Sequence, residues 1–162
     1  MQAFERELLT LLPRLRRFAR ALARDAADAD DLVQAALERA LKAREQWAPG
    51  TRLDSWMMRI MRNCWIDEMR SRTRRARTFV SEEEGASIGS DAHREVEIRA
   101  ELHTVEKAMN SLSAEQREVI ALVLVDGLAY KEAADLLDIP MGTLTSRLTR
   151  GRQALAQMLE AA

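Results

Sequence analysis

Residues 127–148, GLAYKEAADLLDIPMGTLTSRL, carry the clearest structural pattern in the chain. Its apolar residues recur every three or four positions on both sides of Asp138-Ile139-Pro140, which predicts two helices joined by a tight turn. We expect the first, short helix to run from about Tyr130 to Leu137 and the second to begin at Gly142-Thr143. Gly127 stands where a preceding helix would need a left-handed residue at its C-terminus.

The second of these helices has an apolar stripe and a polar face. The stripe, at spacings of three and four residues, consists of Leu144, Leu148, Gly151, Leu155 and Met158 or Leu159. The opposite face carries Ser146, Thr149, Arg150 and Gln153, with Thr143 and Arg147 on its flank. A short helix, a tight turn and a basic, polar helix form the geometry that enters a DNA major groove. An ordinary helical hairpin with a solvated face fits the spacing equally well.

Upstream, Ser113-Ala114-Glu115-Gln116 has the form of a capping box and opens a helix that we expect to reach Val125. Helical periodicity is absent between residues 77 and 94, where the acidic, glycine-containing composition is that of a linker. We therefore predict an all-α protein of two small helical domains, residues 1–76 and 95–162, joined by a flexible linker at 77–94.

The N-terminal domain reads as three helices. Apolar spacing predicts helix across residues 4–46 with one interruption, after which the second helix runs from about Ala29 to Gln46. Pro49-Gly50 marks a loop, and we expect a third helix from about Leu53 to Arg74.

On the third helix a polar stripe stands opposite a broad apolar side that includes Cys64 and Trp65. The stripe, spaced by three and four residues, consists of Arg59, Asn63, Asp67, Arg70 and Arg74. Seven arginines against two acids give residues 59–77 a local net charge of +5. A row of arginines can bind the phosphates of an unpaired nucleic-acid strand, and the Asn63 amide can hydrogen-bond to the edge of a base. We expect Trp56 and Trp65 to be core aromatics and Cys64 to be buried.

The chain has 162 residues and a net charge of −1, which argues against a uniformly basic nucleic-acid binder. The charge is divided, however. Residues 1–80 hold 17 Lys or Arg and 11 Asp or Glu, a net of +6, whereas residues 81–162 hold 8 and 15, a net of −7. Such an asymmetry between halves indicates a charged partner.

The remaining composition narrows the class of protein. One cysteine excludes an intramolecular disulfide and a multi-cysteine zinc site, and neither a signal peptide nor a membrane span is visible, so we expect a cytoplasmic protein. His93 and His103 lack a second ligand or a nucleophile, and no phosphate-binding loop is present. We therefore predict no catalytic residue, no metal and no cofactor.

Several motifs resemble extracytoplasmic-function (ECF) sigma factors of the sigma-70 family, in that family's order and spacing. Residues 114–119, 127–134 and 139–148 resemble region 4 of that family. Residues 29–34 resemble region 2.2, and residues 53–63, together with Asp67 and Arg70, resemble regions 2.3–2.4. The recognition helix departs from the family's usual pattern at three positions, Leu144 for Val, Thr145 for a basic residue and Gly151 for Ala. Thr145 removes a phosphate contact, and Gly151 costs the helix about 1 kcal/mol against Ala.

The resemblance implies a function for each polar face. The last helix would read the −35 promoter element through Thr143, Ser146, Arg147, Thr149, Arg150 and Gln153. The third helix and the loop at 47–54 would bind the −10 element and capture a flipped base, with Asn63 as the main polar reader. An outward face of the second helix, which by itself reads as a solvated surface, would dock the β′ clamp helices of core RNA polymerase through Asp31, Gln34, Ala35, Glu38 and Lys42.

The resemblance also implies further partners: promoter DNA, the β flap of the polymerase, and an anti-sigma factor whose apolar helix would insert between the domains. The stretch Trp47–Thr51 resembles the general-stress subgroup of alphaproteobacterial sigma factors. Two alternatives remain open at this point. One is a sigma-like decoy that sequesters an anti-sigma factor without binding DNA, and the other is a stand-alone helix-turn-helix regulator.

Overall fold

The computed structural model describes residues 2–78 and 93–161, and these residues form helices and no strand, which confirms the all-α prediction. The first part contains α1 (Gln2–Leu22), α2 (Ala26–Lys42), a short 3₁₀ turn (Arg44–Gln46) and α3 (Leu53–Thr78). The second contains α4 (His93–Ser111), α5 (Ala114–Ile120), a π-helical segment (Ala121–Val125), α6 (Tyr130–Leu137) and α7 (Met141–Glu160). Most of the predicted linker lies outside the described residues. No described helix is long and apolar enough to cross a membrane.

The helices of the first part begin and end close to the predicted residues, with three corrections. α2 begins three residues before the predicted Ala29, because Asp25 caps it by accepting a hydrogen bond from the backbone N–H of Asp28 at 2.8 Å. The helix ends at Lys42, and the predicted remainder to Gln46 tightens into the 3₁₀ turn, in which the Gln46 N–H bonds the carbonyl of Ala43 at 2.8 Å. α3 extends to Thr78, four residues beyond the predicted end.

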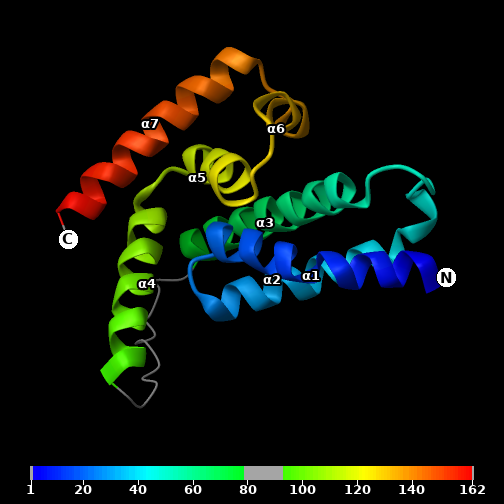
Figure 1. The fold of residues 1–162 in the computed structure, drawn as a ribbon, viewed down its shortest axis with the longest axis horizontal. Coiled ribbons are helices and arrows are strands. Elements are labelled where there is room, and N and C mark those ends of the chain that lie inside the picture. Colours follow the sequence, from blue (N-terminus) through cyan, green and yellow to red (C-terminus); the bar gives the residue numbers. More distant parts are fainter. Residues whose placement is uncertain (1, 79–92, 162) are drawn as a thin grey trace.

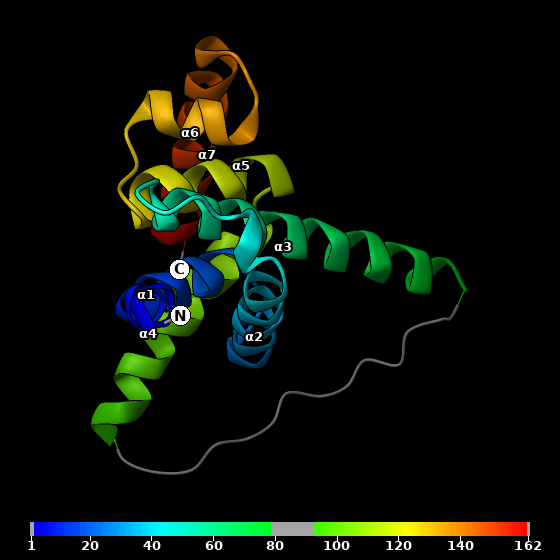
Figure 2. The same cartoon turned by 90° about the vertical axis from the view of Figure 1, so that its right-hand side faces the viewer.

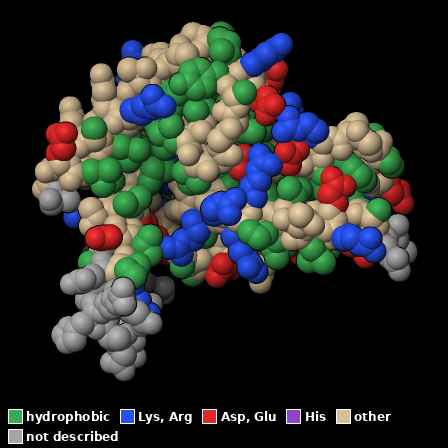
Figure 3. Space-filling model, in the orientation of Figure 1, with side chains coloured by type: hydrophobic (Ala, Val, Ile, Leu, Met, Phe, Trp, Pro, Cys, Tyr) green, Lys and Arg blue, Asp and Glu red, His purple; other side chains and the backbone are tan. Residues whose placement is uncertain are grey.

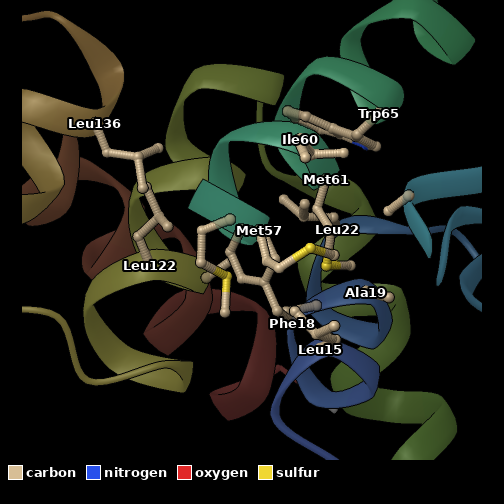
Figure 4. Packing of buried hydrophobic residues seen from close by; sticks show 14 of the residues in the cluster. Leu15, Phe18, Ala19, Leu22, Met57, Ile60, Met61, Trp65, Leu122 and Leu136 are labelled. Atoms are coloured by element: carbon tan, nitrogen blue, oxygen red, sulfur yellow. The ribbon is translucent and has the colours of Figure 1, made fainter. Parts of the chain in front are cut away.

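α1, α2 and α3 pack against one another around a core of large apolar side chains. Phe18 of α1 and Met57 and Met61 of α3 are no more than 1% exposed. Figure 4 shows these side chains converging from α1 and α3, with Leu122 of the π-helical segment beside the Met57 end of the cluster. The buried apolar residues of both parts therefore form one continuous core.

The second part is built on the predicted turns. Ser113 and Gln116 form both hydrogen bonds of a capping box at the start of α5. Gly127 has a φ of +76°, the left-handed conformation expected after that helix. Asp138 ends α6 at a φ of +55°, and the Ile139 N–H bonds the carbonyl of Ala134 at 3.0 Å, which turns the chain tightly into α7.

The two parts lie directly against each other in both Figure 1 and Figure 2, with α5 next to the helices of the first part. α1 contacts α5 and the π-helical segment, and α4 packs on α7. The described helices before and after the predicted linker therefore share an interface and a common core.

Gly151 lies where α7 crosses α5 and is buried there. A Cβ atom at this position would come within 3.0 Å of Cγ1 and 3.2 Å of Cδ1 of Ile120, whose side chain is itself 2% exposed. The glycine therefore lets the two helices approach closely, and a larger residue would require the Ile120 side chain to shift. The low helix propensity of glycine is offset by this packing.

We predict that Gly151→Ala lowers the stability of the protein. Alanine gains about 1 kcal/mol of helix propensity, but crowding Ile120 in a closed core costs about 1–3 kcal/mol. Gly142→Ala on the same helix is the matched control, because nothing lies within 4 Å of a Cβ atom there. Thermal unfolding should give a lower melting temperature for the first variant and an equal or higher one for the second. Equal gains in both variants would contradict the packing argument.

Candidate nucleic-acid interface

The polar stripe predicted on α3 is a continuous exposed surface. Arg59, Asn63, Asp67, Arg70 and Arg74 are all exposed, whereas Met57, Met58, Met61, Cys64 and Trp65 on the other side are buried. Burial raises the pKa of the Cys64 thiol, so this cysteine is an inert core residue. Among the described residues, no acid pairs with Arg59, Arg70 or Arg74, which leaves their charges available to a partner.

A hollow of about 470 Å³ opens between α2 and α3 in the middle of this stripe. Its lining consists of Arg39, Arg62, Asn63, Ile66, Asp67 and Arg70. The Arg39 Nη1 atom donates to Asp67 Oδ2 at 3.2 Å, which holds the α2 guanidinium against the α3 stripe. The lining combines three guanidinium groups, an amide, one apolar side chain and the carboxylate of Asp67. Arg70 has no acid partner among the described residues, so its guanidinium and the Asn63 amide are the groups available to bind a phosphate and an unstacked base.

Sequence reasoning found three of these six residues. Arg62 and Ile66 fall outside the predicted stripe, because they lie one position before Asn63 and Asp67, at its edge. Arg39 belongs to another helix, 24 positions before Asn63 in the chain, and only the packing of α2 on α3 brings it here. In the sequence, the position of Arg62 next to Asn63 is the one feature that could have indicated its place in the hollow.

Arg62 also faces the second part of the chain. Its Nε and Nη2 atoms donate to the two carboxylate oxygens of Glu118 on α5, at 3.0 and 3.4 Å. The Glu118 side chain is only 7% exposed. One edge of the hollow is therefore held by a buried carboxylate from the other helical group.

A second ion cluster joins α1, α3 and the loop after the π-helical segment. Arg14 donates from Nε and Nη2 to both oxygens of Asp126, at 2.6 and 2.8 Å, and from Nη1 to Asp54 at 2.8 Å. Arg52 donates to Asp54 at 2.9 Å and to Glu132 of α6 at 2.7 Å. These hydrogen bonds, first those from Arg52 and then that from Arg14, lower the pKa of Asp54 to about 2.

The loop after the 3₁₀ turn, predicted to capture a base, directs its aromatic residue inward. Trp47 packs on Phe4 with ring centroids 5.5 Å apart, and Trp56 meets the same ring edge-on at 6.2 Å. Together with the buried Trp65, this places the aromatic rings in or against the core, as expected for Trp56 and Trp65. The backbone turns at Gly50, with a φ of +87°.

The face of α2 predicted to dock the polymerase is exposed along its whole length: Asp31, Gln34, Ala35, Glu38 and Lys42. On the opposite side, Leu32, Val33, Ala36 and Ala40 are buried. The alanines let α2 approach its neighbours closely, which leaves the charged face turned away from them. The geometry thus presents these residues together without identifying their partner.

On α7 the predicted polar face lines a shallow groove. The lining consists of Gly142, Thr145, Ser146, Thr149, Arg150 and Gln153. Thr143 and Arg147 are half-buried on the flank, where Arg147 Nη2 lies 3.5 Å from Glu115 Oε1 of α5. The Thr145 hydroxyl bonds back to the carbonyls of Met141 and Gly142, so it adds a polar surface without a charge.

The fold defines the class of protein as a two-part, all-helical chain that ends in a helix-turn-helix. Residues 8–75 match the model of the family "Sigma-70 region 2", and residues 102–155 match "Sigma-70, region 4". The ECF RNA polymerase sigma factor EcfG of Rhodopseudomonas palustris is 35% identical, over 94% of this chain and 83% of that protein. The RNA polymerase sigma factor CarQ of Myxococcus xanthus is 30% identical, over 97% and 89%.

A solved structure has the same fold. The sigma factor RpoE from Bartonella quintana, determined in complex with the anti-sigma factor NepR, superimposes with a TM-score of 0.82 at 33% identity, over 99% of this chain and 98% of that one. The chain therefore belongs to the ECF sigma factors of the sigma-70 family. This confirms the resemblance that the sequence motifs indicated.

We predict that Asp54 stabilises the fold in a pH-dependent way. Its pKa falls from the ordinary 3.8 to about 2 in the folded protein, so its contribution of about 2 kcal/mol is present above about pH 4 and is lost as the pH falls toward 2. Asp54→Asn should lower the urea midpoint of unfolding at neutral pH. It should also make that midpoint depend less on pH between pH 4 and pH 2.

Asp67→Asn is the control for this prediction. It removes a carboxylate from an exposed ion pair with Arg39, and such pairs contribute about 0–1 kcal/mol. Its urea midpoint should stay close to that of the parent protein. Parallel pH curves for the parent protein and Asp54→Asn would show that the Asp54 cluster does not stabilise the fold.

Proposed function

We propose that this sigma factor binds core RNA polymerase, holds the opened −10 strand on α3 and reads the −35 element with α7. The observation that carries the proposal is the hollow around Asn63, which gathers Arg39, Arg62 and Arg70 on one exposed face of the matched region 2. We retain the division into residues 1–76, 77–94 and 95–162, although α3 and α4 each continue two residues into the proposed linker.

The −10 interaction follows from the chemistry of the hollow. Guanidinium groups bind phosphates bidentately, and the Asn63 amide can both donate to and accept from a base edge. An unpaired strand exposes its phosphates and the Watson–Crick edges of its bases at once, whereas a closed duplex hides the Watson–Crick edges in its base pairs. Arg59 and Arg74 extend the cationic surface along α3 for neighbouring phosphates. Elsewhere on the molecule, Lys and Arg side chains form a broken band, interspersed with Asp and Glu, across the face shown in Figure 3.

The −35 interaction follows from the exposed face of α7. Ser146, Thr149, Arg150 and Gln153 point away from the buried stripe, as a recognition helix requires. Arg150 is the only charged member of the groove lining and is therefore the main candidate for a guanine edge or a phosphate. Thr143 and Arg147 would contact the DNA from the flank.

The remaining partners are proposed on the family relationship and the surfaces available. The exposed face of α2, with two acids, an amide and one lysine around Ala35, suits the β′ clamp helices, and the second part would meet the β flap. We further propose control by an anti-sigma factor, because the relative from Bartonella quintana was solved with one. The protein would act in the cytoplasm, where the polymerase and promoter DNA are found.

Reconstituted transcription tests the function. Core polymerase from the source bacterium, supplied with this protein and with promoter fragments recovered by immunoprecipitation of the tagged chain, should give promoter-specific transcripts. Absence of transcripts together with capture of an anti-sigma factor would identify a decoy. Specific binding to duplex DNA without polymerase would identify a stand-alone regulator.

We predict that Asn63→Ala impairs opening of the promoter more than binding of the closed promoter. Loss of a base-edge contact costs about 1–3 kcal/mol, a factor of about 5–150 in the open complex. Permanganate reactivity of unpaired thymines should fall, whereas retention of the promoter duplex on the polymerase should change little. An equal loss in both measurements would place Asn63 outside strand recognition.

We predict that Arg150→Ala weakens recognition of the −35 element. Removal of its contact should lower duplex affinity by about tenfold. Arg152→Ala is the matched control, because it removes the same charge from the same helix but lies outside the groove lining. Band-shift titration of the polymerase complex, on promoters with intact and with scrambled −35 elements, measures the affinity of each variant. Equal losses on both promoters would indicate a general phosphate contact.

A further inference from the structure

The carboxylate of Glu118 occupies the hydrogen-bonding side of Arg62, a residue that also lines the hollow on α3. It receives two N–H groups from Arg62, at 3.0 and 3.4 Å, in the forked arrangement with which arginine binds both carboxylates and phosphates. The same Arg62 lines the hollow with Asn63, Asp67 and Arg70. Glu118 comes from α5, in the part of the chain that contains the −35 reading helix.

We propose that Glu118 competes with the DNA strand for Arg62, so that the contact between the two parts of the chain and the binding of the −10 strand exclude each other. This inference rests on the proposed strand-binding role of α3. The closed arrangement is then a resting state that DNA, acting at α3, helps to open.

The burial of Glu118 makes the competition reciprocal. Its side chain is 7% exposed, and Arg62 is its only ionic partner among the described residues. If Arg62 turned to a phosphate while the parts stayed together, an unpaired carboxylate would remain buried, which is strongly unfavourable. The strand therefore gains full use of Arg62 only when α5 moves away and Glu118 returns to water.

Other interface contacts would open at the same time. The pairing of Arg14 with Asp126 and the hydrogen bond from Arg117 Nη1 to the Leu22 carbonyl both join α1 to the second part. Neither contact involves a residue of the hollow. They therefore provide a way to open the interface without altering the charge at the strand site.

The test compares three variants of the full chain. Glu118→Gln removes the competing charge, and Asp126→Asn weakens the same interface far from Arg62. Asp135→Asn is the matched control, because it removes one exposed negative charge from α6 without an ion pair in the described residues. Circular dichroism verifies that each variant keeps its helix content.

Two quantities are measured at low and high salt. Small-angle scattering gives the radius of gyration of the free chain. Fluorescence anisotropy gives its affinity for a fluorescein-labelled single-stranded DNA of random sequence, about 15 nucleotides long. The apparent affinity scales with the open fraction, so we expect Glu118→Gln and Asp126→Asn to expand the chain and to bind about fivefold or more tightly. Asp135→Asn should match the parent protein in both quantities.

The outcomes separate the competition from the proposed function. Tighter binding by Glu118→Gln without expansion, or expansion of Asp126→Asn without tighter binding, would overturn the competition while leaving α3 as a strand-binding surface. Failure of every protein, including the parent, to bind the oligonucleotide would contradict the strand-binding role itself. In that case the scattering data alone still report whether these residues hold the two parts together.

Discussion

The arrangement of the two parts depends on the burial of Asp126 against Arg14. The carboxylate is 1% exposed and accepts two hydrogen bonds from a single guanidinium group. It reaches this position because the chain widens into a π-helical segment just before it, with the Asp126 N–H bonded to the carbonyl of Ala121 at 2.9 Å. A buried carboxylate is stable only with such a partner, so this contact fixes α5 and its neighbours against α1.

This constraint changes the meaning of the overall charge. The net charge of −1 does not indicate whether the protein binds DNA, because the positive charge of the first half and the negative charge of the second half cancel in the sum. Part of that neutralisation occurs directly across the interface, where Arg14, Arg52 and Arg62 pair with acids of the second part. Three basic side chains of the first part are thus neutralised within the molecule, and one of them, Arg62, also lines the hollow on α3.

The sequence predicted those features that depend on neighbours within about one helical turn. The capping box at Ser113, the left-handed Gly127 and the apolar stripe of α7 are local patterns. The structure has the first two and buries the stripe at Leu144, Leu148 and Gly151, but its predicted end at Met158 or Leu159 is exposed, because it lies in the last turn of the helix. Gly151 was interpreted only by its helix propensity, because its need for space depends on Ile120, 31 positions away.

For the same reason, only some of the residues that line the hollow on α3 could be predicted from the sequence. The polar stripe of α3 is periodic and therefore visible, and the structure exposes every member of it. Arg39 joins the hollow from another helix, and Glu118 reaches Arg62 across 56 positions, distances at which no periodic pattern exists. Family membership was recognisable because sigma factor motifs are themselves local.

The neighbouring residues Arg117 and Glu118 show why the interface behaves as a unit. Arg117 is buried without an acid, which lowers its pKa, and its guanidinium donates to the carbonyls of Met109, Asn110 and Leu22. The partial negative charges at the ends of α4 and α1 thus replace a counter-ion. Both residues belong to one short, rigid helix, so a movement that releases Glu118 from α3 also withdraws Arg117 from α1. Arg117 would keep its hydrogen bonds to the Met109 and Asn110 carbonyls of α4, whereas Glu118 would lose its one ionic partner among the described residues, so the cost of separating the two parts falls mainly on Glu118.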